Sequence, residues 1–449
     1  MKNNLTEGSI SSQLVRLTLP MVGGIFAIVA FNLADTYYVG QLGTERLAAM
    51  SFTFPVVMTL GSLAMGLGIG AASIIARAIG QGDRSRVQRF TTNSLTLGVA
   101  AVALLSSIGL ITIDPLFKAL GAEPDVMPYV REYMQIWYFG MVFLVIPMVG
   151  NSAIRASGDT LTPSLIMVCS AGMNILLDPL LIFGLWGLPE LGLVGAALAT
   201  VISRAVTLIA SLLVLKFKEN MLSSHFPDLT ETLQCWRDIL YIGLPAAGTN
   251  MITPISIGII TSLLAVHGSV AVAGFGVASR IESFAMIVLM ALASTIGPFV
   301  GQNWGAEEYG RVAKALQQSY LFCLAWGVLM AVLLIPGTSL IVPLFNNNQE
   351  VIAIASTYLW LVPISYGMAG IIQVANSAFN ALGRPMPAVI ITVLRMFLLY
   401  IPLAYLGSRW LGTTGIFIAA TVSNLLIGIG AYYWSRRASL SKMDLLEVS

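Results

Sequence analysis

Three carboxylates and three guanidinium groups lie inside long apolar stretches of this 449-residue chain. An ionisable side chain is costly to place in such a stretch, and within a membrane span it usually marks the path of an ion or a substrate. These side chains are therefore the candidates for chemistry, and the chemistry that they suit is the binding and release of a cation. They are Asp35, Asp178, Glu282, Arg204, Arg280 and Arg395.

Asp178 has polar neighbours that would complete a cation site. Asn174 lies four residues earlier, on the same face of a helix. Pro179 has no backbone N–H, so it frees the carbonyl group of Ile175 from its usual helical hydrogen bond. A carboxylate, an amide and a free carbonyl in an apolar setting are suited to bind H⁺ or a small metal cation.

Asp35 and Asp178 are expected at similar depth in a membrane. At a rise of 1.5 Å per residue, Asp35 lies about 28 Å and Asp178 about 24 Å along the helix axis from the predicted start of its own span. Two carboxylates close together and out of water resist being charged at once, so the pair would hold one proton near neutral pH. The alternative is that each aspartate is simply paired with an arginine, for instance Arg204.

A second polar group falls in the second half of the chain. Glu282, Arg395 and Gln373 form a candidate second-lobe polar site, with Glu282 as a ligand for an ion or a substrate. The alternative, which we favour at this stage, is that Glu282 and Arg395 form a buried ion pair. Buried charges are normally paired, and such a pair would have no transport role.

Composition determines which elements must position these residues. Apolar residues make up 57% of the chain and charged residues 10%, whereas soluble proteins have roughly 45–50% and 25%. The chain is therefore predicted to be an all-α integral membrane protein with twelve spans of about 20 residues each. The longest polar interruption separates an amino-terminal lobe (residues 1–215) from a carboxy-terminal lobe (residues 239–449), with residues 216–238 as a cytoplasmic linker.

The two halves resemble each other in sequence, which indicates two parallel six-helix repeats. Leu19-Pro20 recurs as Leu244-Pro245, Gly80-Gln81 as Gly301-Gln302, and Leu191-Gly192 as Leu411-Gly412. The counterpart of Asp178 in the second half is Ile401, and no acid occupies the counterpart of Asp35. The acid pair is therefore predicted to serve a cation site in the amino-terminal lobe alone.

Most lysines and arginines outside the spans fall in alternate loops. Basic residues are retained on the cytoplasmic side of a membrane. The chain is therefore predicted to be a multi-pass protein of the inner, cytoplasmic membrane with both termini in the cytoplasm.

Several classes of function are excluded by what the sequence lacks. It has only two histidines, His225 and His267, and no Walker loop, GxSxG elbow or CxxC pair, so no enzyme activity, metal site or cofactor is predicted. The net charge of +2 does not indicate a nucleic acid partner. The glycines at 66, 68 and 70 indicate close helix packing. The energy for transport must then come from an ion gradient, as in a secondary active transporter.

These motifs together resemble the multidrug and toxic compound extrusion (MATE) family over essentially the whole chain. The resemblance rests on Leu19-Pro20, on the doubled Gly-Gln loops and on three further segments. Those are residues 32–40 (NLADTYYVG), 155–159 (RASGD) and 174–179 (NILLDP). An aspartate in the first span combined with Asn-xxx-Asp-Pro in the fifth resembles the DinF-like branch.

The resemblance implies a V-shaped, two-lobed antiporter that exports amphipathic, often cationic, drug-like compounds in exchange for H⁺, with Na⁺ as the alternative. It implies that Asp35, Asn174 and Asp178 form the cation site, with Thr200 as an additional member. Pro20 would suit a hinge in the first span.

Two other functions stay open at this stage. A lipid or lipid-linked oligosaccharide flippase of the same superfamily would also have two lobes, but more basic residues are expected in its cavity. A membrane receptor or an enzyme subunit would not need a repeat with an acid pair in one lobe. The expected partners are membrane lipid, small molecules and the coupling ion, and the chain is predicted to be a monomer.

Overall fold

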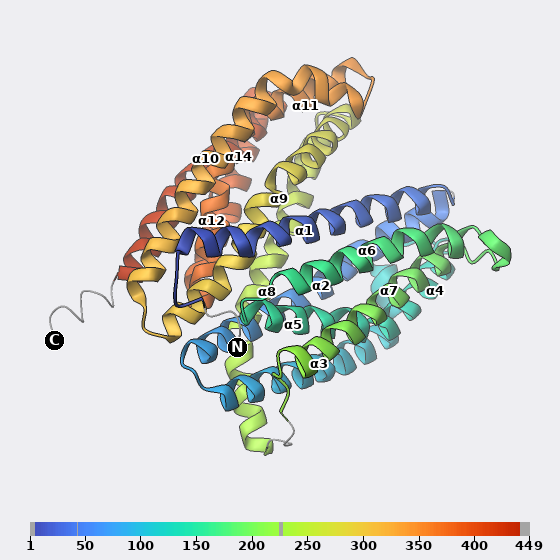
Figure 1. Ribbon diagram of the computed structural model, residues 1–449. Helices are drawn as coiled ribbons and strands as arrows, with labels where there is room; N and C mark the ends of the chain where they lie inside the picture. Colours follow the sequence, from blue (N-terminus) through green and yellow to red (C-terminus); the bar gives the residue numbers. More distant parts are fainter. Residues whose placement is uncertain (1–4, 43, 224–227, 441–449) are drawn as a thin grey trace. The chain divides into compact units, whose positions relative to one another are not determined.

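The structure is a computed structural model that describes residues 5–42, 44–223 and 228–440, so that His225 lies outside the described residues. Within these ranges long helices follow one another with short connections (Figure 1). The helices are α1 (Ile10–Gly40), α2 (Thr44–Gly80), α3 (Arg84–Ala119), α4 (Met127–Gly140), α5 (Val142–Ala156), α6 (Leu161–Ile182), α7 (Leu193–Leu213), α8 (Leu229–Ala265), α9 (Ser269–Gly305), α10 (Tyr309–Ile341), α11 (Gln349–Leu361), α12 (Tyr366–Ala381), α13 (Pro385–Val393) and α14 (Ile401–Leu440).

Short 3₁₀ or π segments interrupt or extend the helices. They are Leu185–Gly187, Val214–Lys218, Val342–Leu344, Val362–Ser365 and Leu394–Tyr400.

The prediction of twelve spans is confirmed in the described part of the chain. Ten segments are each long and apolar enough to cross a membrane, and α4 and α5, bent by 41° at their junction, together make an eleventh. One of the ten, Pro385–Ser439, has 55 residues and reverses direction at Gly412, so it crosses twice. Gly407 and Gly415, on either side of that reversal, are in close backbone contact. In a continuous helix their Cα atoms would lie about 12 Å apart.

The same glycine turn occurs in both halves, which confirms the predicted repeat. Gly192 before α7 has φ 56° and ψ −128°, and Gly412 has φ 61° and ψ −141°. Only glycine adopts this conformation readily, because it lacks a Cβ atom. Three residues later, a Cβ atom on Gly195 or on Gly415 would overlap a backbone carbonyl group of the preceding helix.

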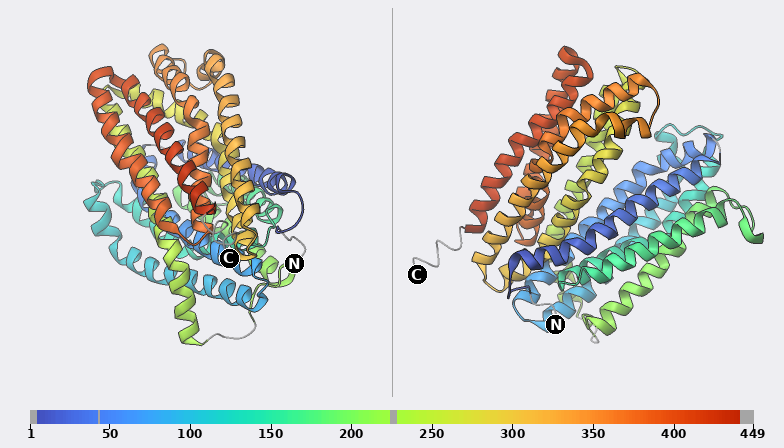
Figure 2. Two further views of the ribbon diagram at one scale, coloured as in Figure 1. Left: turned by 90° about the vertical axis from the view of Figure 1, so that its left-hand side faces the viewer. Right: turned by 45° about the horizontal axis from the view of Figure 1, so that its top comes forward.

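Packing divides the chain into two compact units. One unit contains residues 19–247, and the other contains residues 5–18 together with Gly248 onward. The helices α1 and α8 therefore each contribute to both units. In the first unit α2 packs on α5 and α6 packs on α7, and in the second α12 packs on α9, α10 and α14 (Figure 2). The boundaries predicted at 215 and 239 describe the sequence repeat and stay a prediction.

The glycines of α2 permit the close packing that the sequence indicated. A Cβ atom on Gly66 would overlap the Gly243 carbonyl oxygen and lie 2.5 Å from the Ala247 Cβ atom of α8. Nothing lies within 4 Å of a Cβ atom built on Gly61 of the same helix. Backbone atoms cannot move aside as a flexible side chain can, so this contact requires glycine at position 66.

We expect Gly66→Ala to lower the free energy of unfolding by about 1–3 kcal/mol, the usual cost of overpacking. The measurement is thermal unfolding of the purified protein in detergent, followed by tryptophan fluorescence. Gly61→Ala is the matched control and should melt like the wild type. Equal melting temperatures for all three proteins would show that α2 and α8 are not in backbone contact.

The RASGD segment forms the connection between α5 and α6. Asp159 accepts hydrogen bonds from the Thr162 backbone N–H at 3.0 Å and from Lys218 Nζ at 2.6 Å. Burial opposes ionisation of this carboxyl group, but the hydrogen bonds from Lys218 and Thr162 outweigh that effect and lower its pKa. The hydrogen bonds of Asp159 thus connect Lys218, which follows α7, with Thr162 at the start of α6.

Candidate cation site

Three of the predicted site residues meet between α6 and α7. Asp178 is fully buried, and Asn174 is 2% exposed. With the Asn174 amide turned so that both of its polar atoms are satisfied, Nδ2 donates to Asp178 Oδ2 at 2.8 Å and the amide oxygen accepts from the Thr200 backbone N–H at 3.2 Å. The structure therefore brings together Asp178, Asn174 and Thr200.

The second oxygen of Asp178 is free to bind a ligand. Oδ1 is buried and has no hydrogen-bond partner among the described residues. A buried carboxylate oxygen without a partner is unfavourable unless a proton or a cation occupies it. The helix α6 continues through Pro179, so the Ile175 carbonyl lacks its usual helical donor and is a further oxygen ligand nearby.

Asp35 completes the acid pair from α1. Its side chain is partly buried, and it lies close enough for its charge to act on Asp178. Both charges also act on Tyr133 of α4. Within the described part of the chain, neither Asp35 nor Asp178 forms an ion pair.

The alternative of an ion pair between Asp178 and Arg204 is wrong for this conformation. Arg204 of α7 forms no ion pair or hydrogen bond with any described residue. The negative charge of the site is thus not neutralised by an arginine, which leaves a proton or a metal cation to balance it.

The second-lobe group is arranged differently from the prediction. The carboxylate of Glu282 accepts a hydrogen bond from the Tyr358 hydroxyl group. Arg395 is near enough for its charge to act on Glu282, but no ion pair forms between them, so the predicted pair is wrong. Among the described residues, Gln373 makes no hydrogen bond to either side chain. The hydrogen-bond partner of this acid is thus a tyrosine, with Arg395 farther away.

Sequence reasoning missed both Tyr133 and Tyr358. Each lies in an apolar helix, where a tyrosine normally serves packing. Their partners are far away in the sequence: Tyr133 lies within range of the charges of Asp35 and Asp178, and Tyr358 bonds Glu282. No local pattern could have revealed these interactions.

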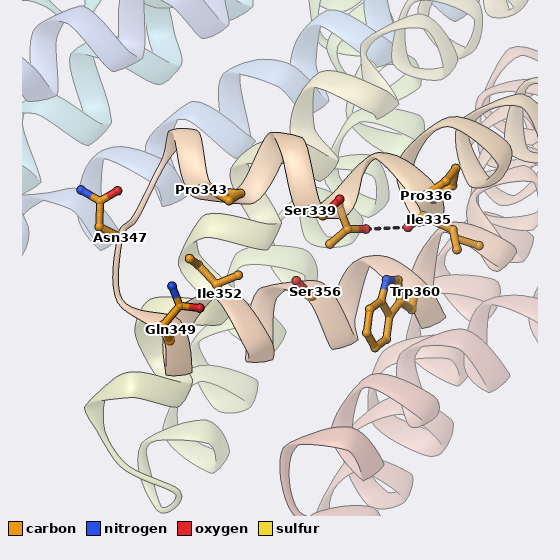
Figure 3. Close-up of a pocket in the computed structure, with 10 residues that line it drawn as sticks. Ile335, Pro336, Ser339, Pro343, Asn347, Gln349, Ile352, Ser356 and Trp360 are labelled. Carbon is orange, nitrogen blue, oxygen red and sulfur yellow. Dashed lines mark hydrogen bonds between the residues drawn. The ribbon is translucent and has the colours of Figure 1, made fainter.

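A groove lies in the second unit, between the end of α10 and the start of α11. It has a volume of about 460 Å³, and Figure 3 shows its lining side chains, including Asn347, Gln349 and Trp360. The Thr338 hydroxyl group donates to the Ile335 carbonyl oxygen at 2.9 Å. No residue that lines the groove has an ionisable side chain, so nothing there could bind a coupling proton.

Comparison with known proteins decides the family. The family model described as MatE matches residues 20–180 and again residues 245–406. The chain belongs to the MATE transporter family. The two matches lie one in each half, in agreement with the repeat of the glycine turn.

The relatives of this MATE transporter share its full length. It is 39% identical over 436 residues to the FAD transporter of Shewanella oneidensis, covering 97% of this chain and 96% of that protein. It is 26% identical to the multidrug export protein MepA of Staphylococcus haemolyticus, covering 98% of each. The crystal structure of the Vibrio cholerae MATE transporter VcmN in the bent form superimposes with a TM-score of 0.90 at 30% identity, covering 97% of this chain and 98% of that one.

Membership of the family has two direct consequences. MATE proteins are multidrug efflux transporters and not enzymes, and this chain is a multi-pass membrane protein that acts on small molecules.

Proposed function

We propose that this MATE transporter is an antiporter that exports amphipathic organic compounds in exchange for protons bound by Asp35 and Asp178. The observation that carries the proposal is a pair of interacting acids, one of them fully buried, that no arginine neutralises. Two such carboxylates share a proton readily, because ionising both would place two like charges out of water.

The site would couple the two fluxes through a change of conformation. Facing the more acidic exterior, the pair takes up a proton, and facing the cytoplasm it releases that proton. Substrate leaves with the deprotonated form. A proton gradient can drive this exchange only if the proton and the substrate favour different conformations. A ligand that binds both conformations with equal affinity does not change their populations.

Pro20 is the proposed hinge for that change. It lies inside α1. One turn later Gly24 packs closely on α6, because a Cβ atom at this position would lie only 3.2 Å from the Ser164 Cα atom. A bend at Pro20 would therefore move α1 relative to the helix that carries Asp178. The related VcmN has been crystallised in a bent form, which supports this proposal by analogy.

Na⁺ is the alternative coupling ion. It would require several oxygen ligands around an ionised Asp178, and the Asn174 amide and the Ile175 carbonyl could supply two of them. The deciding experiment is efflux from proteoliposomes with a pH gradient as the only driving force.

A flavin dinucleotide is the second candidate substrate. The observation that favours it is the 39% identity with a protein named as an FAD transporter, against 26% with the multidrug exporter. FAD is an anion, whereas typical substrates of multidrug exporters are cations. Liposomes loaded with FAD or with ethidium, an organic cation, separate the two substrate classes in the same efflux assay.

We propose that both termini lie in the cytoplasm of a cell whose inner membrane holds the protein. In a variant without native cysteines, an impermeant maleimide added from outside should label Glu190→Cys and Glu350→Cys, and leave Arg84→Cys and Lys314→Cys unlabelled. All four positions are exposed in the structure, so accessibility depends on the side of the membrane alone. The opposite labelling pattern would show that both termini lie outside the cell membrane and would contradict the proposed topology.

A further inference from the structure

A small cavity, lined by both apolar and polar side chains, lies beside the cation site, within the first unit. Its volume is about 40 Å³, and α1, α5, α6 and α7 supply its walls. Asn174 and Thr200 of the cation site line part of it, and its other polar lining residues include Asn151, Ser203 and Arg204.

Three of these lining side chains have polar atoms with no protein partner among the described residues. The Asn151 Oδ1 atom and the Ser203 Oγ atom are buried and make no hydrogen bond. The Arg204 guanidinium has five N–H donors, and none of them reaches a described acceptor. Leaving a buried polar atom such as Asn151 Oδ1 or Ser203 Oγ unsatisfied costs about 1–3 kcal/mol. Arg204 is only partly buried but offers free donors beside them, so a ligand that both donates and accepts hydrogen bonds is expected between the three side chains.

Water is the ligand that fits this space. A buried water needs roughly 10–15 Å³ of free volume and two to four polar partners. The cavity therefore has room for about two or three water molecules, and its lining offers an acceptor, a hydroxyl group and several donors. A metal cation is disfavoured in the same space because the charge of Arg204 repels it.

The cavity also lies on a continuous polar face of α7. Thr200, Ser203, Thr207 and Ser211 follow one another at spacings of three and four residues, which places them on one side of the helix. The last three are buried, with exposed fractions of 4% or less. From Thr200 to Ser211 this face runs about 16 Å along the helix at 1.5 Å per residue, towards the end of α7 that the proposed topology places at the cytoplasm.

We propose that the cavity binds water and forms the cytoplasmic branch of the proton path from Asp178. This inference rests on the proposed proton antiport and names the route by which the proton leaves. The Asp178 carboxyl group gives its proton to a water at the Asn174 end and becomes a carboxylate. That water, now carrying the proton, passes one proton on to its neighbour, and the last water passes one to the cytoplasm.

The first test measures the water itself. Hydroxyl radicals generated by short X-ray pulses oxidise methionines next to bound water, and mass spectrometry locates the sulfoxides. Met148 lines the cavity and is half-buried, and Met50 is a half-buried methionine of the same unit that does not line it. We expect Met148 to oxidise several-fold faster than Met50. Oxidation of Met148 no faster than that of Met50 would show a dry cavity and overturn the proposal.

The second test removes the polar lining. Asn151→Leu keeps the branched shape of the side chain but replaces its polar atoms by bulkier methyl groups that also fill the cavity, and Ser203→Ala removes one hydroxyl group. Both replace an unpartnered polar atom by an apolar one, so a merely structural role predicts unchanged or higher stability and unchanged transport. We expect instead that efflux driven by a pH gradient slows on the order of tenfold. Exchange of substrate for substrate, which moves no proton, should keep its rate.

The matched control is Ser94→Ala in α3, a buried serine whose hydroxyl group donates to the Phe90 carbonyl oxygen at 2.7 Å. It should leave both rates unchanged. Normal pH-driven efflux in Asn151→Leu and Ser203→Ala would overturn the water path and leave proton antiport intact. Wild-type protein that ignores the pH gradient would instead overturn the proposed function, and with it the role of the cavity as a proton path.

Discussion

Asp35→Asn and Asp178→Asn should each reduce proton-driven efflux to the rate of protein-free liposomes, while the variants still accumulate in the membrane. Asparagine keeps the size and hydrogen-bonding oxygen of aspartate but cannot bind or release a proton. The Asn174 amide that donates to Asp178 Oδ2 at 2.8 Å would still find an acceptor there, so the fold should lose no more than about 1 kcal/mol. The measurements are efflux from proteoliposomes and the yield of purified protein.

Asp114→Asn is the matched control for these variants. Asp114 is paired with Arg131 at 2.8 Å, and both side chains are exposed. Surface ion pairs of this kind contribute little to stability, about 0–1 kcal/mol, and this one lies outside the cation site. Its efflux should equal that of the wild type. Loss of accumulation in both Asp35→Asn and Asp178→Asn, with normal accumulation of Asp114→Asn, would instead assign a structural role to the acid pair.

Efflux should be driven by a pH gradient alone, in buffer free of Na⁺. Substrate should move towards the more acidic side, because the proton that drives it enters there and leaves on the other side. A difference of one pH unit is a proton driving force of about 1.4 kcal/mol, which sustains about a tenfold substrate concentration ratio for each proton exchanged. The measurement follows the release of FAD or ethidium from loaded proteoliposomes.

The same assay identifies both the coupling ion and the class of substrate. A Na⁺ gradient without a pH gradient should have no effect on the rate. Efflux that requires Na⁺ and ignores pH would overturn proton coupling and favour the site made by Asn174 and the Ile175 carbonyl around an ionised Asp178. Release of FAD with retention of ethidium would identify a flavin exporter, and the reverse result a cation exporter.

The sequence by itself determined the spans, the repeat and which acids lie within the spans. Lipid imposes these features locally: a span must be apolar along its length, and an acid within it stands out whatever its neighbours are. The identity of Asn174 as a partner of Asp178 also followed from spacing, since residues four apart share a face of a helix. The turn at Gly412 could be recognised because Gly192 repeats it.

Only the tertiary structure decided which helix faces meet. Rotation of a helix about its axis by one residue, about 100° at 3.6 residues per turn, changes every contact between helices and leaves the apolar pattern of a span almost unaltered. For this reason the alternative of Arg204 paired with Asp178 stayed open from the sequence, whereas Arg204 lines a cavity, and Glu282 bonds Tyr358 rather than Arg395. Tyr133 lies within range of the charges of the acid pair for the same reason.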